Sequence, residues 1–299
     1  DRIAHHAIMN VIEPYLVKRF TSDTYSCIKG RGIHLAVKRL KHALKTDPKN
    51  TKYCLKLDVK KFFPSVDQKI MMDLFNRIFK DKIRKDCKTI VVPMTVEPER
   101  FSVKRDNKLG EYIAYCGDIG GNKDGVHNLI TAFSYIANDF PNLKLILIGG
   151  SKNPDERMKL EAYVKEINCR NVVFYGVVPR DEIPPLLTNA KMLALARPSS
   201  LQSSGGFPTK LGEYLSTGKP TIVTSVGDIP LYIEDGRHAF LVSPDDNFAF
   251  AEKIKFVINN YENALRVAEN GKTLVYDIFN YKVQAKRIND FLLELIASI

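Results

Sequence analysis

The chain has 299 residues, of which 44% are hydrophobic and 26% charged, a composition typical of a globular protein rather than of a disordered or fibrous one. No apolar run approaches the roughly 18 residues needed to cross a bilayer, so we expect no transmembrane helix. The five cysteines are scattered and form no CxxC pair, which argues against a disulfide framework and against structural zinc. We therefore expect a cytoplasmic protein, with peripheral attachment to a membrane as an open alternative.

The net charge of +11 comes entirely from the first third of the chain. Residues 1–87 contain 20 Lys and Arg against 9 Asp and Glu, whereas residues 88–299 contain 25 of each kind. This segregation predicts two domains with different partners, the first of which faces a polyanion such as RNA or DNA. A basic surface that is simply solvated accounts for the charge equally well.

The clearest strand pattern of the basic segment covers residues 53–59, where apolar and polar side chains alternate. Asp58 falls at the end of this expected strand, among lysines. A carboxylate in this setting can bind Mg²⁺ together with phosphate, although an ordinary surface Asp–Lys pair explains it too.

The segment LKLDVKKFFPSVD, residues 55–67, resembles motif A of reverse transcriptases. Residues 1–6 and 29–32 resemble the fingers region of bacterial retroelement polymerases. The resemblance implies a partial, mainly helical α+β segment of fingers and early palm over residues 1–87. It implies metal binding by Asp58, screening of the sugar 2′ position by Phe63, and nucleic-acid contact by Lys29 and Arg31.

Two-metal polymerase chemistry needs further carboxylates, which this family supplies from a YxDD hairpin. The only DD in the sequence is Asp245-Asp246, which lacks the Tyr and is interpreted as a turn and a helix cap. Mg²⁺ at Asp58 is therefore expected only if other carboxylates are supplied. We expect no polymerase activity from residues 1–87.

Residues 88–299 alternate between expected strands and helices. The strands are expected at residues 112–116, 143–148, 172–175, 192–196, 221–224 and 240–242, and the helices between them at residues 126–140, 155–167, 181–188 and 208–216. Repeated β-α units of this size predict a doubly wound, parallel, Rossmann-like α/β sheet. An amphipathic stretch near the C-terminus, residues 281–295, is more typical of a core-packing helix than of a membrane or subunit contact.

Ligands of such sheets bind beyond the carboxyl ends of the strands, where loops enter helices. Two Gly-rich loops have this position, residues 117–125 and residues 197–210. Their backbone N–H groups and the helix N-termini that they open suit phosphate, and Lys210 adds a full positive charge. One turn later, Glu213 can accept hydrogen bonds from ribose hydroxyls. Neither loop matches GxGxxG, and a plain long connection is the alternative for the second loop.

Four motifs in this half occur in a recognisable order: YCGDIGGNKDGVHNLITAF, LKLILIGG, VVFYGVVP and GGFPTKLGEYLSTGKPTIVTSVGDIPLYIEDG. With them, residues 88–299 resemble the C-terminal, nucleotide-sugar-binding domain of group 1 (family 4) glycosyltransferases of the GT-B fold. The resemblance implies retaining transfer from a nucleotide-diphosphate sugar, with no metal cofactor required. The loops and the resemblance together give the candidate donor-binding residues Gly120, Gly121, Lys123, Arg197, Gly205, Gly206, Phe207, Lys210 and Glu213.

The sequence departs from this family in its charged residues. Of the two glutamates spaced E-x7-E, Glu213 fits the second, but Gly205 stands at the first. Asp118 replaces the usual Arg of the first loop, and Lys123 lies one residue from the usual Lys. The catalytic residues are therefore not identified.

The lobe that binds the acceptor in this family is replaced by residues 1–87, so the acceptor is unknown. Two rival hypotheses remain. The chain is a reverse-transcriptase fragment that binds nucleic acid, or it is an inactive chimera of the two segments.

Overall fold

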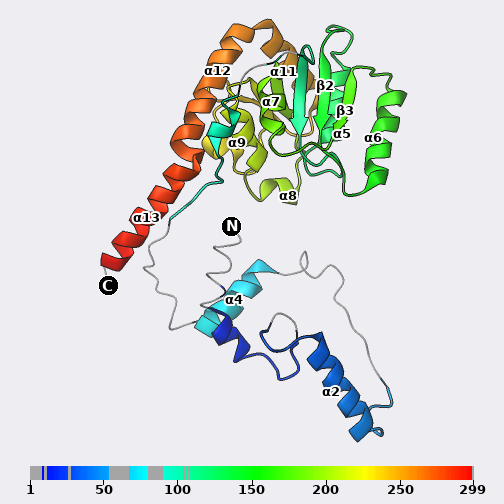
Figure 1. Ribbon diagram of the computed structural model, residues 1–299, viewed down its shortest axis with the longest axis vertical. Helices are drawn as coiled ribbons and strands as arrows, with labels where there is room; N and C mark the ends of the chain where they lie inside the picture. Colours follow the sequence, from blue (N-terminus) through cyan, green and yellow to red (C-terminus); the bar gives the residue numbers. More distant parts are fainter. Residues whose placement is uncertain are drawn as a thin grey trace. The chain divides into compact units, whose positions relative to one another are not determined.

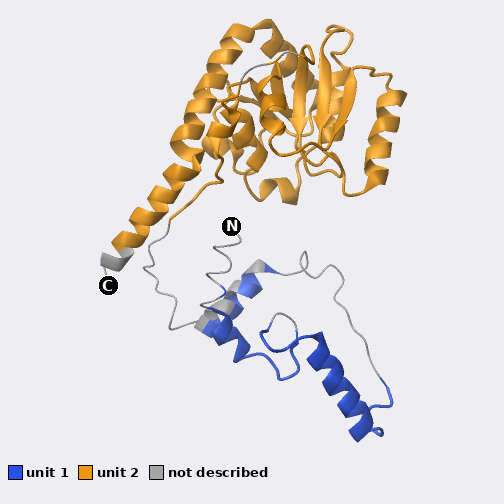
Figure 2. Cartoon of the chain, in the orientation of Figure 1, with its two compact units in different colours: residues 1–89 blue, residues 90–299 orange. Residues whose placement is uncertain are grey.

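The computed structural model describes residues 9, 12–25, 28–53, 67–79, 90–103, 106 and 108–297. The chain forms two compact units, residues 1–89 and residues 90–299 (Figure 2). The described helices of the first unit include α2 (Ile33–Thr46) and α4 (Gln68–Phe79) (Figure 1). The strand expected at residues 53–59 lies outside the described residues apart from its first residue, and so do Asp58 and Phe63. The roles inferred for these two residues stay predictions.

The second unit is built on a six-stranded sheet with all strands parallel. The strands are β1 (Tyr112–Cys116), β2 (Lys144–Ile148), β3 (Val172–Gly176), β4 (Met192–Leu195), β5 (Thr221–Thr224) and β6 (Phe240–Val242), in the order β3-β2-β1-β4-β5-β6. Every residue of β4 and β5 is buried, as expected of parallel strands that are covered on both faces. The predicted doubly wound α/β sheet is confirmed.

Helices cover both faces of this sheet (Figure 1). The connecting helices are α5 (Val126–Ser134), α6 (Pro154–Glu166), α7 (Ile183–Thr188), α8 (Leu201–Ser204), α9 (Thr209–Ser216) and α10 (Ile229–Tyr232). The chain runs from β1 to β3 in one direction across the sheet, and from β3 through β4 to β6 in the other. Because each crossover is right-handed, α5 and α6 lie on one face of the sheet, and α7 and α9 lie on the other. The closing helices are α11 (Asn247–Asn259), which packs on α5, and α12 (Tyr261–Leu274), which packs on α9.

The largest difference from the predicted helices is at α5, while α7 and α9 begin one or two residues later than predicted. The sequence predicts a helix over residues 126–140, but α5 ends at Ser134 and turns continue the chain to residue 139. The Ser134 hydroxyl donates a 2.7 Å hydrogen bond to the Thr131 carbonyl oxygen, and thereby competes with the backbone ladder of the helix.

The segment before β1 belongs to the core of the second unit. Val96 exchanges backbone hydrogen bonds with Phe279 (2.8 Å) and Tyr281 (3.1 Å), at the π-helical turn η2 (Val275–Phe279). The short 3-10 helix η1 (Pro98–Phe101) follows at once and buries Phe101. This anchoring positions Arg100 next to α9, because η1 packs directly on that helix.

The C-terminal helix α13 (Tyr281–Ala297) projects from the second unit (Figure 1). The sequence favours a core-packing helix at residues 281–295, and this interpretation is wrong over most of the length of α13. Among its described side chains only Gln284 is buried, while Ile288, Leu292 and Leu293 are exposed. Within the described residues, no helix is long and apolar enough to span a membrane.

Candidate functional site

The candidate site lies beyond the carboxyl ends of β1 and β4. These strands are neighbours in the sheet, and the strand order reverses between them, which is where doubly wound sheets bind ligands. A pocket of about 490 Å³ lies between the loops that follow them, within the size range of small-molecule sites. Its lining residues are Gly117, Asp118, Lys123, Asp124, Arg197, Gln202, Gly205, Gly206, Phe207, Pro208, Thr209 and Lys210.

Two glycines allow the loops to approach each other closely. Gly125 has a φ of 67°, and a Cβ atom there would overlap the Ala196 carbonyl oxygen at the end of β4. A Cβ atom at Gly117 would overlap the Lys210 ammonium. Only glycine fits at position 125, which combines a positive φ with an overlap against backbone atoms, whereas the Lys210 side chain could move away from a Cβ atom at position 117.

The two cations of the second loop share a carboxylate of the first. Lys210 Nζ donates a 2.5 Å hydrogen bond to Asp124 Oδ2, and Arg197 Nε lies 3.6 Å from Asp124 Oδ1. Asp124 is only 6% exposed. A buried carboxylate of this kind is stable because cations surround it.

Tyr115 completes this charged cluster from inside the sheet. Its hydroxyl donates to the Asp118 carbonyl oxygen (2.7 Å) and lies 3.1 Å from both Asp124 Oδ2 and Lys210 Nζ. Burial, with the nearby Asp124 carboxylate as a second cause, raises the pKa of the Tyr115 hydroxyl, so the phenol is neutral. The Lys210 ammonium also lies 4.7 Å from the centre of the Tyr115 ring, a cation–π distance.

The second loop is held by its own polar contacts. Ser200 caps α8 in a reciprocal capping box with Ser203, and the Ser199 N–H donates a 2.9 Å hydrogen bond to Asp245. The interpretation of Asp245-Asp246 as a turn and a helix cap is confirmed, since Asp246 caps α11 through the Ala249 N–H.

Helix α9 starts at the rim of the pocket. Pro208, at its N-cap, offers no side-chain acceptor to the first N–H groups of the helix. These donors and the positive end of the helix dipole lie next to Thr209 and Lys210 in the lining, an arrangement that attracts anions. The Phe207 ring packs against other aromatic rings of the protein. It packs 5.0 Å from the Phe279 ring and 5.8 Å from the Tyr232 ring, measured between centroids.

Glu213 lies one turn after Lys210 on α9, beside the pocket rather than in its lining. Its carboxylate is 3.5 Å from Arg100 Nη1. Burial raises the pKa of the Glu213 carboxyl, while Arg100 is the strongest of the cations that offset this effect. Burial, followed by the charge of Glu213, raises the pKa of the Cys116 thiol to about 11. The next residue of α9, Tyr214, accepts a 2.7 Å hydrogen bond from the Cys116 N–H, so this part of α9 lies against the end of β1.

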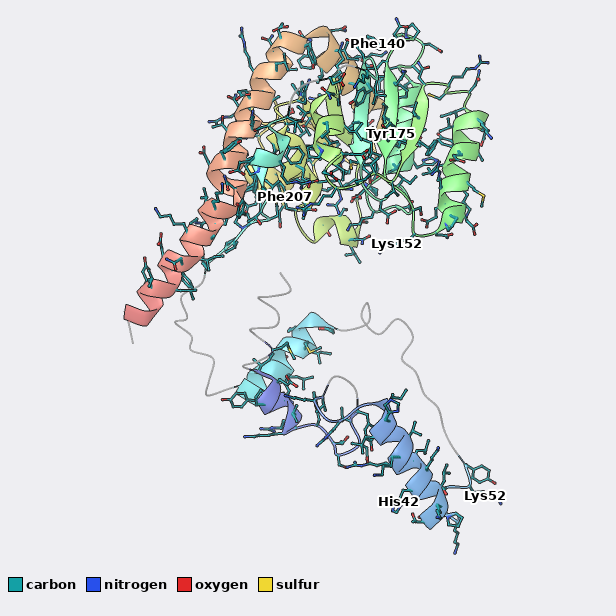
Figure 3. All side chains as sticks on the ribbon, in the orientation of Figure 1. His42, Lys52, Phe140, Lys152, Tyr175 and Phe207 are labelled. Carbon is teal, nitrogen blue, oxygen red and sulfur yellow. The ribbon has the colours of Figure 1, made fainter. Side chains whose placement is uncertain are left out.

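A second, more apolar pocket of about 410 Å³ adjoins the first along the carboxyl ends of β1, β2 and β3. Gly117 and Asp118 line both pockets. The side wall of the second pocket includes Val177, which is 80% exposed. Figure 3 labels Phe207 in the lining of the first pocket and Lys152 in that of the second.

The structure brings six of the candidate donor-binding residues into one lining: Lys123, Arg197, Gly205, Gly206, Phe207 and Lys210. Glu213 is adjacent, whereas Gly120 and Gly121 lie outside this lining. Gly120 packs against Ser151 and Glu156, and its N–H donates to the Asp118 side chain.

Sequence reasoning missed Asp124, Tyr115 and Arg100 as parts of the site. The sequence signal for Asp124 is slight, an Asp before a glycine in the first loop. Its partner Lys210 lies 86 residues further along the chain.

In the first unit, Lys29 and Arg31 belong to a tight turn around Gly30, which has a φ of 78°. The Arg31 guanidinium donates a 3.2 Å hydrogen bond to the Thr21 carbonyl oxygen, and Lys29 is exposed. Nothing in these contacts tests their expected role in nucleic-acid binding. In the part of the chain that the structure describes, no group of three or more His, Cys, Asp or Glu could hold a metal ion.

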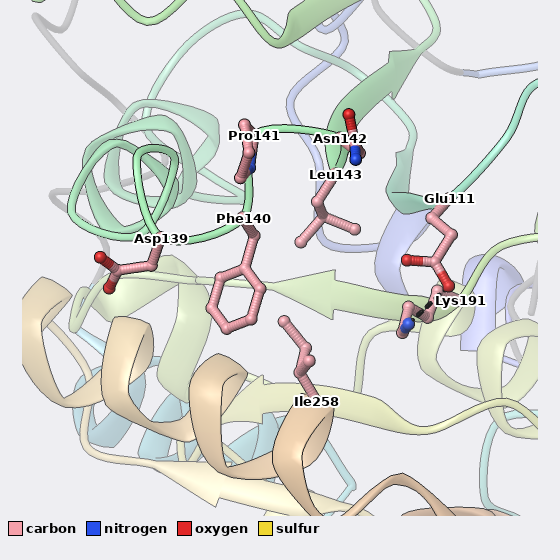
Figure 4. A pocket seen from close by; sticks show the side chains of 8 residues that line it. All are labelled: Glu111, Asp139, Phe140, Pro141, Asn142, Leu143, Lys191 and Ile258. Atoms are coloured by element: carbon pink, nitrogen blue, oxygen red, sulfur yellow. Dashed lines mark hydrogen bonds and ion pairs between the residues drawn. The ribbon is translucent and has the colours of Figure 1, made fainter.

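Another pocket lies at the amino ends of the strands, on the side of the sheet opposite to the first two pockets (Figure 4). It encloses about 210 Å³, and an ion pair of 2.6 Å between Lys191 and Glu111 lies in its wall. Both residues directly precede strands, so this pocket lies at the amino ends, away from the ligand edge of doubly wound sheets. We do not assign it a ligand.

Comparison with known proteins gives a consistent result. The family model for "Glycosyl transferases group 1" matches residues 83–274, well over half of the chain. Trehalose phosphorylase of Grifola frondosa is 27% identical over 191 residues, which cover 57% of this chain and 25% of that protein. Mannosylfructose-phosphate synthase of Agrobacterium fabrum is 31% identical over 143 residues, 46% of this chain and 30% of that protein. The chain thus spans less than a third of the length of these relatives.

Solved structures with the same fold include HepE of Anabaena in complex with UDP-glucose, with a TM-score of 0.62 and 18% identity over 73% of this chain and 60% of that one. The C-terminal domain of the group 1 family protein LpcC from Francisella tularensis matches with a TM-score of 0.55 and 21% identity. That match covers 62% of this chain and 99% of the LpcC domain.

Proposed function

The chain belongs to the group 1 glycosyl transferases, and we propose that residues 90–299 are a GT-B donor domain, which binds a nucleotide-diphosphate sugar for retaining glycosyl transfer. The observation that carries this proposal is the cationic pocket at the reversal of strand order, where Lys210 and Arg197 meet the uncapped start of α9.

The diphosphate of the donor would occupy the first pocket. Three cations, Lys123, Arg197 and Lys210, and two carboxylates, Asp118 and Asp124, line it, so its net charge is positive. The first N–H groups of α9 add donors with fixed directions. Charge-assisted hydrogen bonds from such groups are the usual means of holding phosphate oxygens.

The nucleoside would extend into the second pocket. Its apolar wall suits the faces of a base, and its two shared residues make it continuous with the phosphate pocket. A ribose between base and diphosphate would then lie near Glu213, which is close both to Lys210 and to the end of β1. An ionised carboxylate accepts hydrogen bonds from two neighbouring hydroxyls, the pattern that a ribose presents.

Transfer breaks the bond between the anomeric carbon and the diphosphate, so negative charge develops on the leaving phosphate. Lys210, Arg197 and the start of α9 would stabilise that charge without moving, which is the most effective form of electrostatic catalysis. Position 205 is a glycine, so no carboxylate from that position can contact the donor sugar. We propose that the acceptor and the opposite wall of the cleft come from outside residues 90–299.

Isothermal titration calorimetry tests the proposal. UDP, GDP and ADP, and their glucose or mannose conjugates, are titrated into the full chain. We expect one of the three bases to bind in the micromolar range, and Lys210→Met to weaken that binding at least 10-fold. The matched control, Lys165→Met, removes an exposed lysine of α6 and should leave binding unchanged. Absence of binding at millimolar nucleotide would contradict the proposal.

A further inference from the structure

Lys210 and Arg197 are both paired with Asp124. The exposed fractions of the three side chains are 16%, 5% and 7% respectively, so solvent screens these charges little. Asp124 Oδ2 accepts the short hydrogen bond from Lys210 Nζ, and Asp124 Oδ1 faces Arg197 Nε at 3.6 Å. The carboxylate thus occupies the cations that the proposed function assigns to a diphosphate.

A diphosphate in this pocket would meet Asp124 directly, since Asp124 belongs to the lining. Like charges in a poorly solvated site repel each other, so the carboxylate opposes the ligand. The Lys210 ammonium has three N–H donors, and Asp124 and the Tyr115 hydroxyl already take two of them. A phosphate oxygen must therefore share Lys210 with Asp124 or displace it.

We propose that Asp124 is an internal counterion that competes with the diphosphate for Lys210 and Arg197, and that it thereby weakens the binding of nucleoside diphosphates. This inference rests on the proposed function. Asp124 keeps two buried cations from being left without a carboxylate partner when no phosphate is bound, which would be costly. After transfer, its return to Lys210 speeds the release of the nucleoside diphosphate.

A merely orienting role for Asp124 has the opposite consequence. If the carboxylate served to aim Lys210 at the phosphates, its removal would weaken diphosphate binding. The sign of the change in affinity therefore decides between the two roles.

The test compares Asp124→Asn with Asp118→Asn in the full chain. Both substitutions remove one negative charge from the same lining, but the Asp118 carboxylate accepts a hydrogen bond from the Gly120 N–H, whereas Asp124 is the ion-pair partner of the two cations. Inorganic pyrophosphate and uridine are the calorimetric probes. We expect Asp124→Asn to bind pyrophosphate about 10-fold more tightly than the wild type, with unchanged uridine affinity because Asp124 does not line the second pocket, and Asp118→Asn to gain at most about threefold in pyrophosphate affinity.

Several results would overturn the inference: unchanged or weaker pyrophosphate binding by Asp124→Asn, an equal gain of pyrophosphate affinity in the two variants, or a gain of uridine affinity in Asp124→Asn as large as its gain for pyrophosphate. If Asp124→Asn loses the native circular dichroism spectrum, the comparison becomes Lys210→Met against Asp124→Asn/Lys210→Met. The double variant removes one charge of each sign, and should bind pyrophosphate more tightly than Lys210→Met because it frees Arg197. Equal or weaker binding overturns the inference.

Failure of the inference is distinguishable from failure of the proposed function. If wild-type protein binds neither UDP, GDP and ADP nor pyrophosphate at millimolar concentration, the proposed function fails and the inference fails with it. If the wild type binds and Asp124→Asn gains nothing, only the inference fails.

Discussion

Lys210, on the first turn of α9, donates a 2.5 Å hydrogen bond to Asp124 in the loop that follows β1. The two residues lie 86 positions apart, yet the adjacency of β1 and β4 in the sheet brings their loops together. The contact places the positive charge of the second loop against the first, at the only reversal of strand order in the six-stranded sheet. The proposed donor pocket is therefore a product of the sheet topology rather than of a local motif.

Glu213 gives the proposed nucleoside site a defined pH dependence. Its raised pKa means that the carboxyl gains a proton at a higher pH than an ordinary Glu. As the pH falls through that pKa, ribose loses a charged acceptor, and we expect uridine affinity to fall by about fivefold, since hydrogen bonds to charged groups exceed neutral ones by about 1 kcal/mol. Uridine itself does not titrate in the acidic range. Calorimetry between pH 4 and pH 8 measures the effect.

Glu213→Gln is the control for this pH profile. Its uridine affinity should be low at pH 7 and should not change with pH. Titration of Glu213 does not itself promote acid unfolding, because a raised carboxyl pKa contributes stability that is present below the unfolded value and is lost as the pH rises through the folded one. Identical profiles for wild type and Glu213→Gln would contradict the role of Glu213.

Arg100 lowers the pKa of Glu213 against the effect of burial. Its guanidinium, 3.5 Å from the carboxylate, is the strongest influence that opposes the effect of burial on the pKa of Glu213. Arg100→Met should therefore shift the fall in uridine affinity to a higher pH. Arg157→Met breaks a surface ion pair with Glu161 on α6 and should leave the midpoint in place. An unshifted midpoint in Arg100→Met would show that the two residues are not coupled.

Gly125 is the point at which the two loops meet. We expect Gly125→Ala to lower the free energy of unfolding by about 2 to 5 kcal/mol, because the positive φ and the overlap with the Ala196 carbonyl add up. Gly176→Ala is the matched control, with a φ of 93° but open space around the new methyl group, and should cost about 1 to 2 kcal/mol. Urea unfolding, followed by near-ultraviolet circular dichroism of the buried tyrosines, compares the two. Equal losses of unfolding free energy in the two variants would contradict the expectation, because the overlap with the Ala196 carbonyl would then add no cost.

The two units should also separate by function. We expect residues 90–299 alone to bind nucleoside diphosphates as tightly as the full chain, because the pocket lies wholly within this unit. If residues 1–89 bind RNA through their basic side chains, RNA binding by the full chain should weaken steeply with salt and vanish on their removal. Filter binding at 50 and 200 mM salt measures it. Salt-independent RNA binding, or binding by residues 90–299 alone, would contradict the expectation.

Much of the second unit could be predicted from sequence. The bounds expected for β1, β5 and β6 agree with those observed, because these strands are short apolar runs between polar or turn-forming residues. The C-terminal end of α5 was predicted wrongly, since apolar periodicity continues past the point where Ser134 ends the helix. Helix periodicity also suggested that α13 is buried, but its apolar side chains have no core to join.

The site was only half predictable. Gly-rich loops before helices signal phosphate binding through local chemistry, and they identified Lys210 and Arg197. Their pairing with Asp124, and that of Glu213 with Arg100, depends on contacts between residues 73 to 113 positions apart. Such contacts exist only once the sheet order is set, so sequence periodicity cannot reveal them.

The most direct measurement is a crystal structure of the chain with a nucleoside diphosphate bound. We predict the diphosphate between residues 117–125 and the start of α9, within hydrogen-bond distance of Lys210, with the base against Val177. A nucleotide bound at the first unit instead, or bound at the amino ends of the strands, would contradict the assignment of residues 90–299 as a donor domain.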